Sequence, residues 1–241
     1  MARNIYDNEE FFAAYSRLER SLQGLDGAPE WSVLRAMLPE LRRRKALDLG
    51  CGFGWFCRWA YERGAAEVLG IDVSEKMLAR AKAMTTNRGI SYIRADLENL
   101  ALPVAVFDLV YSSLAFHYVE RLDALIATVH AALVPGGSLV FSVEHPMTTA
   151  SAGADWILNA GRRVWPVAGY FDEGSRSTDW LAKGVIKQHR TVATYVNTLL
   201  RHGFGLSGFE EWSPSEAQVR MRPEWAPERE RPFFLLVAAA R

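Results

Sequence analysis

Three features are scarce in this chain of 241 residues: cysteine, net charge and long apolar runs. The two cysteines, Cys51 and Cys57, have neither a metal-ligand nor a redox spacing, so we expect free thiols and no metal site. Lysine plus arginine and aspartate plus glutamate number 28 each. This balance removes the long-range field that would attract nucleic acid or an anionic membrane, and neither is expected as a partner.

No apolar run reaches the roughly 18 residues that a membrane-spanning helix needs. The N-terminus also lacks the basic-then-apolar order of a signal peptide. We therefore expect a cytoplasmic protein. Hydrophobic residues make up 49% of the chain, which is enough for a full core, and there is no internal repeat. A single domain over 1–241 is predicted.

From residue 46 onwards, short apolar runs alternate with helical periodicity. Strands separated by helices of about 10 to 15 residues favour right-handed crossovers and a mostly parallel sheet, so the predicted class is α/β. The expected strands are 46–49, 68–71, 90–94, 107–111, 138–143, 206–212 and 233–240, and the expected helices after the first strand are 56–63, 74–84, 119–133 and 191–201.

Two segments fall outside this alternation. Residues 1–44 carry apolar side chains at helical spacing and predict an N-terminal helical cap. Residues 146–188 are rich in aromatics, and a loose loop of that length is uncommon, so we expect an insertion or lid over the active site. Its aromatic side chains either wall a pocket or form the insertion's own core, and both interpretations stay open. They include Trp156, Trp165, Tyr170, Phe171 and Trp180.

A glycine-rich turn joins the first strand to the next helix, where 47–54 reads LDLGCGFG. Glycines there allow a sharp turn and let a ligand approach backbone amides at the positive end of a helix. A dinucleotide site would require glycine where Trp55 stands, and a phosphate-binding P-loop would require Lys-Ser/Thr at 55–56. What remains is GxGxG preceded by an acidic residue within the strand.

Further signals follow in order along the chain. Asp72 ends the second strand, about twenty residues after the glycines, where a carboxylate can accept hydrogen bonds from ribose hydroxyls. The segments IRADL at 93–97, FDLVYSSL at 107–114 and LVPGGSL at 133–139 end or begin later strands. Together with the glycine turn, these segments resemble the motifs of class I S-adenosylmethionine-dependent methyltransferases.

The resemblance implies a Rossmann-like sheet of seven mostly parallel strands in the order 3-2-1-4-5-7-6, with the last strand antiparallel and helices on both faces. It implies S-adenosylmethionine as cofactor and S-adenosylhomocysteine as product, with Asp72 on the ribose and Asp96 on the adenine. The cofactor-binding residues that we expect are Tyr15, Asp48, Gly50, Cys51, Gly52, Asp72, Val73, Met77, Ala95, Asp96, Leu97 and Ser112.

Methyl transfer needs alignment and exclusion of water more than any fixed catalytic group. If a general base is used, the candidates are His117, His145 and His189, because histidine titrates near neutrality. Ligands collect at the carboxyl ends of parallel strands, so His117 and His145 are expected to border one cleft. Arg20 and Arg190 are candidates to pair with a carboxylate of the cofactor or acceptor.

The predicted function is methyl transfer to a small-molecule acceptor. Zero net charge supports it, as does the absence of an Asn/Asp-Pro-Pro-Tyr/Phe sequence after the fourth strand, where 112–115 reads SSLA. One alternative is a methyltransferase acting on RNA or protein, and another is a non-catalytic, regulatory protein that binds the cofactor. A nicotinamide-dependent oxidoreductase is a third, disfavoured by Trp55. A homodimer is compatible with the sequence, which does not identify the acceptor.

Overall fold

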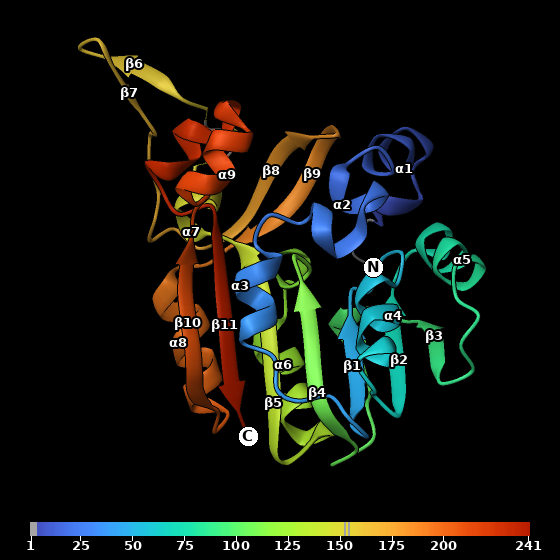
Figure 1. The fold of residues 1–241 in the computed structure, drawn as a ribbon. Coiled ribbons are helices and arrows are strands. Elements are labelled where there is room, and N and C mark those ends of the chain that lie inside the picture. The colour runs from blue at the N-terminus through green and yellow to red at the C-terminus, as the bar shows by residue number, and fades with distance from the viewer. Residues whose placement is uncertain (1–3, 152, 154) are drawn as a thin grey trace.

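The computed structural model describes residues 4–151, 153 and 155–241 and centres on one seven-stranded sheet (Figure 1). Its order is β3-β2-β1-β4-β5-β11-β10, which confirms the predicted α/β topology. Only β11 runs against its neighbours, pairing antiparallel with β5 and β10. The strands are β1 (Lys45–Leu49), β2 (Glu67–Asp72), β3 (Ile90–Arg94), β4 (Phe107–Ser113), β5 (Leu133–Glu144), β10 (Gly205–Trp212) and β11 (Phe234–Ala240).

Helices cover both faces of the sheet, and each face has its own apolar cluster (Figure 1). On one face lie α3 (Trp31–Ala36), α4 (Trp55–Glu62) and α5 (Glu75–Ala83), and on the other lie α6 (Leu122–Ala132) and α8 (Val192–Arg201). Side-chain caps fix two starts: Ser74 accepts from the Met77 amide at α5, and Thr191 accepts from the Thr194 amide at α8.

The N-terminal segment divides into two parts. Helix α3 packs its Trp31 and Leu34 against the sheet, whereas residues 4–27 lie over the carboxyl ends of the strands (Figure 1). We call residues 4–27 the N-terminal cap. It contains α1 (Glu9–Tyr15), α2 (Glu19–Leu22) and the 3₁₀ helices η1 (Ile5–Asp7) and η2 (Gly24–Gly27).

Residues 146–189 form a short helix and two antiparallel hairpins. Helix α7 (Pro146–Thr149) precedes the projecting hairpin of β6 (Ile157–Asn159) and β7 (Arg162–Val164). The second hairpin, β8 (Gly174–Trp180) with β9 (Ala182–His189), stands beside the N-terminal cap (Figure 1).

The aromatics of this insertion have different surroundings. Trp165 and Trp156 lie over the guanidinium of Arg231, with ring centroids 3.8 and 5.6 Å from its Cζ. Trp180 makes edge contacts with Phe11 and Tyr15 of the N-terminal cap, while Phe171 is exposed. The two interpretations left open by the sequence therefore each hold for part of the set: Trp156 and Trp165 pack within the fold, and Trp180 faces the cap.

Some boundaries differ from the sequence-based expectation. Residues 116–118 form a separate 3₁₀ helix, η4 (Phe116–Tyr118), so α6 begins at Leu122 and not at 119. The proline-containing segment before β11 holds α9 (Glu216–Met221) and η5 (Pro223–Arg229), which the polar composition did not reveal. Another short turn, η3 (Leu97–Asn99), follows β3. No helix among the described residues is both long and apolar enough to cross a membrane.

The core predicts a measurable stability difference. Leu47 on β1 is fully buried, whereas Leu200 on α8 is 51% exposed. Leu47→Ala should lower the free energy of unfolding by roughly 2 to 5 kcal/mol, because it leaves a cavity between packed layers. Leu200→Ala, the matched control, should cost about 0.5 kcal/mol or less. Urea unfolding measures both, and equal losses would contradict this description of the core.

Candidate active site

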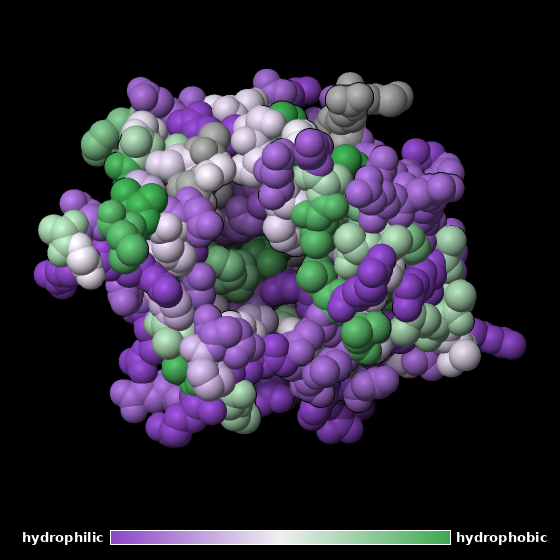
Figure 2. Space-filling model, turned by 90° about the horizontal axis from the view of Figure 1, so that it is seen from above, coloured by the Kyte–Doolittle hydropathy of each residue, from purple (hydrophilic) through white to green (hydrophobic). Residues whose placement is uncertain are grey.

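A cavity of about 750 Å³ opens at the carboxyl ends of the parallel strands. Seen from above, the molecule is hollowed near its centre (Figure 2). The walls come from the glycine turn after β1, the end of β2, the turn after β4, the N-terminal cap and the β8–β9 hairpin. The cavity therefore lies where open α/β sheets bind ligands.

The glycine turn leaves open space on the cavity side. Gly50 and Gly52 have positive φ angles of 78° and 50°, a backbone conformation that costs other residues energy. A Cβ on Gly50 would lie 2.4 Å from the Cβ of Ala115, so Gly50 is needed for packing. A Cβ on Gly52 would meet nothing within 4 Å. Since Gly52 lines the cavity, any side chain there would occupy space available to a ligand.

Asp72 holds this turn in place. Its Oδ2 accepts a hydrogen bond of 2.8 Å from the Gly52 amide, and its Oδ1 accepts one of 2.9 Å from the Ser74 amide. Burial raises the pKa of Asp72, although the backbone amides that it binds act in the opposite direction. Each oxygen retains a lone pair for a further donor.

Most of the predicted cofactor residues gather around this cavity. Asp48 and Cys51 border instead a second pocket of about 80 Å³, which shares Tyr15, Gly50 and Gly52 with the larger one. Burial raises the pKa of Asp48 to about 7. The predicted residues that line the large cavity are Tyr15, Gly50, Gly52, Asp72, Val73, Met77, Asp96 and Leu97.

Two predicted cofactor residues line neither space. Ser112 is fully buried, and its hydroxyl donates a 2.7 Å hydrogen bond to the Leu49 carbonyl. Ala95 packs against the core while its amide donates to the Asp72 carbonyl. Both therefore support the strands around the site without facing it. The structure places Ser113, one residue after Ser112, at the cavity wall.

The three candidate histidines are not brought together. His145 is 1% exposed, its Nε2 lies 2.9 Å from Glu211 Oε1, and its Nδ1 accepts from the Met147 amide. His189 is fully buried between Thr149 Oγ1 and the Tyr170 carbonyl. Contrary to the expectation, His145 does not border the cavity, and His189 does not border it either.

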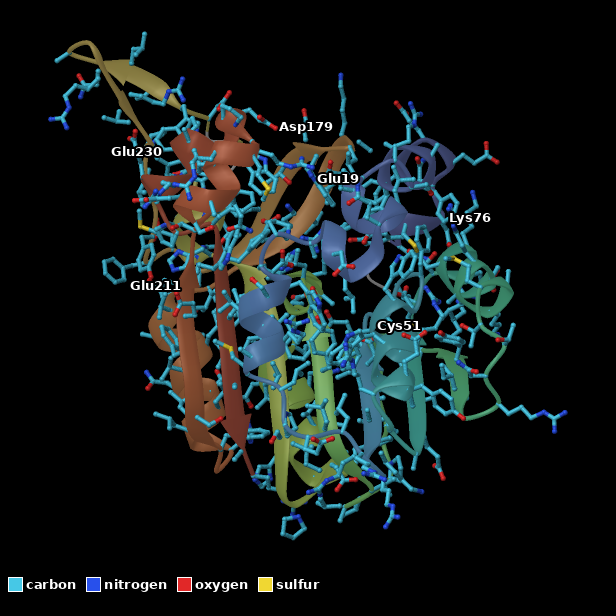
Figure 3. The ribbon with its side chains drawn as sticks, viewed as in Figure 1. Glu19, Cys51, Lys76, Asp179, Glu211 and Glu230 are labelled. Atoms are coloured by element: carbon cyan, nitrogen blue, oxygen red, sulfur yellow. The ribbon has the colours of Figure 1, made fainter. Side chains whose placement is uncertain are left out.

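The hydrogen-bond partner of His145 explains why its side chain lies away from the cavity. His145 pairs with Glu211 on β10, and Glu211 lies on the opposite side of the sheet from Cys51 of the glycine turn (Figure 3). Burial lowers the pKa of His145 and of His189.

His117 does line the cavity. Its Nδ1 accepts a hydrogen bond of 3.3 Å from the Glu144 amide, so the neutral ring carries its proton on Nε2. Burial lowers the pKa of His117 to about 4. The ring is therefore a neutral hydrogen-bond donor at neutral pH, which is a different role from the predicted general base.

The two candidate arginines are already engaged. Arg20 binds both carboxylate oxygens of Glu30 at 3.1 Å and still borders both pockets. Arg190 is buried and donates to the backbone carbonyls of Val119 and Glu120, so it holds the segment between η4 and α6, and it lines neither pocket.

Sequence reasoning missed one charged group at the other end of the cavity. Glu144 ends β5, lines the cavity and pairs through Oε1 with Lys187 Nζ at 2.5 Å. An acidic residue at the carboxyl end of a parallel strand is the signal that identified Asp72, and it applies equally to Glu144. Lys187 comes from β9, and nothing local in the sequence indicates its position.

Comparison with known proteins agrees with this geometry. Residues 47–141 match the family model described as a methyltransferase domain. An S-adenosylmethionine-dependent methyltransferase from Mesorhizobium loti has a crystal structure with 59% identity and a TM-score of 0.87, over 90% of this chain and all of that one. The chain belongs to the S-adenosylmethionine-dependent methyltransferases.

Two relatives found by sequence show how much of the chain is shared with other proteins. An uncharacterized protein of Haemophilus influenzae is 36% identical over 99% of this chain and 97% of its own length. The malonyl-[acyl-carrier protein] O-methyltransferase of Enterobacter lignolyticus is 38% identical, but over only 46% of this chain and 43% of its own length. That second match covers less than half of either chain and leaves the acceptor undetermined.

The residues of this methyltransferase suit the cofactor that its family uses. The open space at Gly52 admits a ligand against the glycine turn, and the Asp72 and Asp96 carboxylates face the same cavity. In the smaller pocket, Ser21 Oγ and Trp55 Nε1 are buried and have no hydrogen-bond partner among the described residues. These donors and acceptors fit a polar nucleotide with an amino-acid end.

His117 predicts how stability depends on pH. Because its pKa is about 4 when folded and 6.5 otherwise, the unfolded chain takes up the proton first as pH falls. Between pH 7 and pH 5 this residue should lower the free energy of unfolding by about 2 kcal/mol. The variant His117→Gln lacks this titrating ring. Over the same interval its free energy of unfolding, measured in urea, should therefore fall by about 2 kcal/mol less than that of the wild type. An identical pH dependence in both proteins would contradict the assignment.

Proposed function

We propose that this methyltransferase transfers a methyl group to a small-molecule acceptor bound inside the large cavity. The observation that carries the proposal is one continuous cavity with two different ends. Asp72, Asp96 and the glycine turn lie at one end, and His117 and Glu144 lie at the other. Cofactor and acceptor can therefore lie side by side in a single chamber.

The nucleotide end is proposed to hold the cofactor. Asp72 accepts from the ribose hydroxyls, Asp96 from the adenine amino group, and Val73, Met77 and Leu97 supply apolar contacts to the ring. The amino-acid end extends toward the smaller pocket, where Arg20 and Asp48 are available for its carboxylate and ammonium groups. When bound, S-adenosylmethionine supplies a methyl group already activated on a sulfonium.

The N-terminal cap and the β8–β9 hairpin are proposed to close the large cavity. Asp7 of the N-terminal cap binds the Ser74 hydroxyl and the Lys76 amide at the start of α5, which holds the cap over the nucleotide end. On the opposite side the cap meets Trp180 of the β8–β9 hairpin. We propose that this hairpin, within the insertion 146–188, acts as a lid that excludes water.

The cap is also linked to the C-terminal segment. Glu19 on α2 pairs with Arg222, and the Gln218 side chain donates to the Pro29 carbonyl at 2.8 Å. These contacts roof the cavity, and such a roof favours an acceptor small enough to be enclosed. The cavity walls carry six acidic residues but three arginines, a balance that disfavours an RNA acceptor.

A single substitution tests whether the glycine turn is the cofactor site. Gly52→Val places a side chain in the cavity and should raise the Kd for S-adenosylhomocysteine at least roughly a hundredfold, about 2.7 kcal/mol. Gly136→Val is the matched control, because Gly136 also has a positive φ of 78° and open space, but lies at the start of β5.

Both variants carry the same kind of backbone strain, so both should lose similar stability. Calorimetric titration should show wild-type affinity for Gly136→Val and a large loss for Gly52→Val. If the folded Gly52→Val protein binds as tightly as the control, the cofactor lies elsewhere.

A further inference from the structure

The carboxylate of Glu144 has one oxygen that the protein does not use. Oε1 is bound by Lys187 Nζ, whereas Oε2 accepts no hydrogen bond from any residue in the described part of the chain. The side chain retains 20% exposure although it lies deep at the end of β5, and it lines the cavity. An anionic oxygen therefore points to the acceptor end and is accessible to a bound molecule.

Lys187 offsets much of this charge through Oε1 but leaves Oε2 free as an acceptor. It is 5% exposed and is not among the wall residues, and its Nζ lies 4.9 Å from the ring centroid of Trp180. The ammonium therefore stands behind Glu144 and anchors it. A ligand in the cavity therefore contacts the Glu144 carboxylate and not the Lys187 ammonium.

The walls near Glu144 combine this negative charge with aromatic surface. Tyr118 follows His117 in η4, Trp180 comes from β8, and Phe233 and Phe234 lie at the start of β11. The rings of Trp180, Phe233 and Phe234 already lie near the cations of Lys187, Arg231 and Arg20, so these aromatics supply apolar surface for the body of an acceptor. Burial acts to raise the pKa of Glu144, but the charge and the hydrogen bond of Lys187, together with the charge of Arg231, hold the pKa below its usual range.

From this placement we infer that the acceptor is a small amine with an aromatic or apolar body, whose nitrogen donates a hydrogen bond to the free oxygen of Glu144. The inference rests on the proposed function, because it assigns an acceptor class to the same cavity. A carboxylate acceptor would face an unpaired oxygen of like charge, which costs energy in a partly buried site. Glu144 thus acts as a specificity-determining residue.

The transfer balances without a general base. An amine that is protonated in water releases its proton to the solvent before transfer and then reacts as the free amine: its lone pair forms the new nitrogen–carbon bond, while the electron pair of the broken carbon–sulfur bond stays on sulfur. Positive charge passes from sulfur to nitrogen, and the product leaves as a methylated ammonium ion. The ionised Glu144 stabilises this developing charge through its hydrogen bond, and no proton moves within the site.

Matched acceptor sets test the assignment. Tryptamine, tryptophol and indole-3-acetate share a ring system but carry an amine, a hydroxyl and a carboxylate, as do 2-phenylethylamine, 2-phenylethanol and phenylacetate. Each is titrated calorimetrically into wild-type protein saturated with S-adenosylhomocysteine, and S-adenosylhomocysteine release is measured with S-adenosylmethionine. The amine of each set should bind at least roughly tenfold more tightly than its partners, and only the amines should be methylated.

The variant Glu144→Gln should weaken amine binding at least roughly tenfold and leave S-adenosylhomocysteine binding unchanged. Because it leaves Lys187 unpaired, the double variant Glu144→Gln, Lys187→Gln removes both charges and should show the same loss. Glu67→Gln is the control, since Glu67 pairs with Lys45 at 3.0 Å on the surface, at the first residue of β2. It should bind amines as the wild type does.

The amine assignment is overturned if a hydroxyl or carboxylate member binds best, if no amine binds, or if both Glu144 variants keep wild-type amine affinity. These outcomes differ from failure of the proposed function. If S-adenosylhomocysteine does not stabilise the wild-type protein in a thermal-shift measurement, the cavity is not the methyl-transfer site. If it does and the amines show no preference, only the acceptor class is refuted.

Discussion

The two hydrogen bonds accepted by Asp72 are the constraint on which the site depends. They tie the Gly52 amide of the first turn to the Ser74 amide at the start of α5, and so fix two strand ends against each other. Because Ser74 also binds Asp7, the same network positions the N-terminal cap. One partly buried carboxylate therefore shapes the glycine turn, the helix start and the position of the N-terminal cap.

The two ends of the large cavity differ in the chemistry of their side chains as well as in position. At the nucleotide end, backbone amides and two aspartates are arranged by neighbouring parallel strands. The other end is assembled from β5, η4 and β9, which are distant in sequence, and it combines Glu144 and His117 with aromatic faces. The nucleotide end is formed by strands within the segment that matches the family model, and we propose that the acceptor is selected at the other end.

The sequence predicts the fold, and it predicts that Gly52 and Asp72 lie at one cavity, because these signals are local. Gly52 and Asp72 are recognised from a strand, a turn and a fixed spacing. The acceptor end and the placement of the histidines depend on distant pairs: Glu144 contacts Lys187, 43 residues later, at the cavity, and His145 contacts Glu211, 66 residues later, away from it. Similarly, Ser112 and Ser113 are adjacent on β4 and face opposite sides of the sheet. The sequence-based prediction named Ser112, which is buried, whereas its neighbour Ser113 lines the cavity.

A crystal structure of the protein with S-adenosylhomocysteine tests the central claim most directly. The account predicts density across the carboxyl ends of β1, β2 and β3, with the ribose hydroxyls on Asp72 and that carboxylate still bound to the Gly52 and Ser74 amides. Density elsewhere, or an Asp72 side chain turned away from both amides and from the nucleotide, would contradict it.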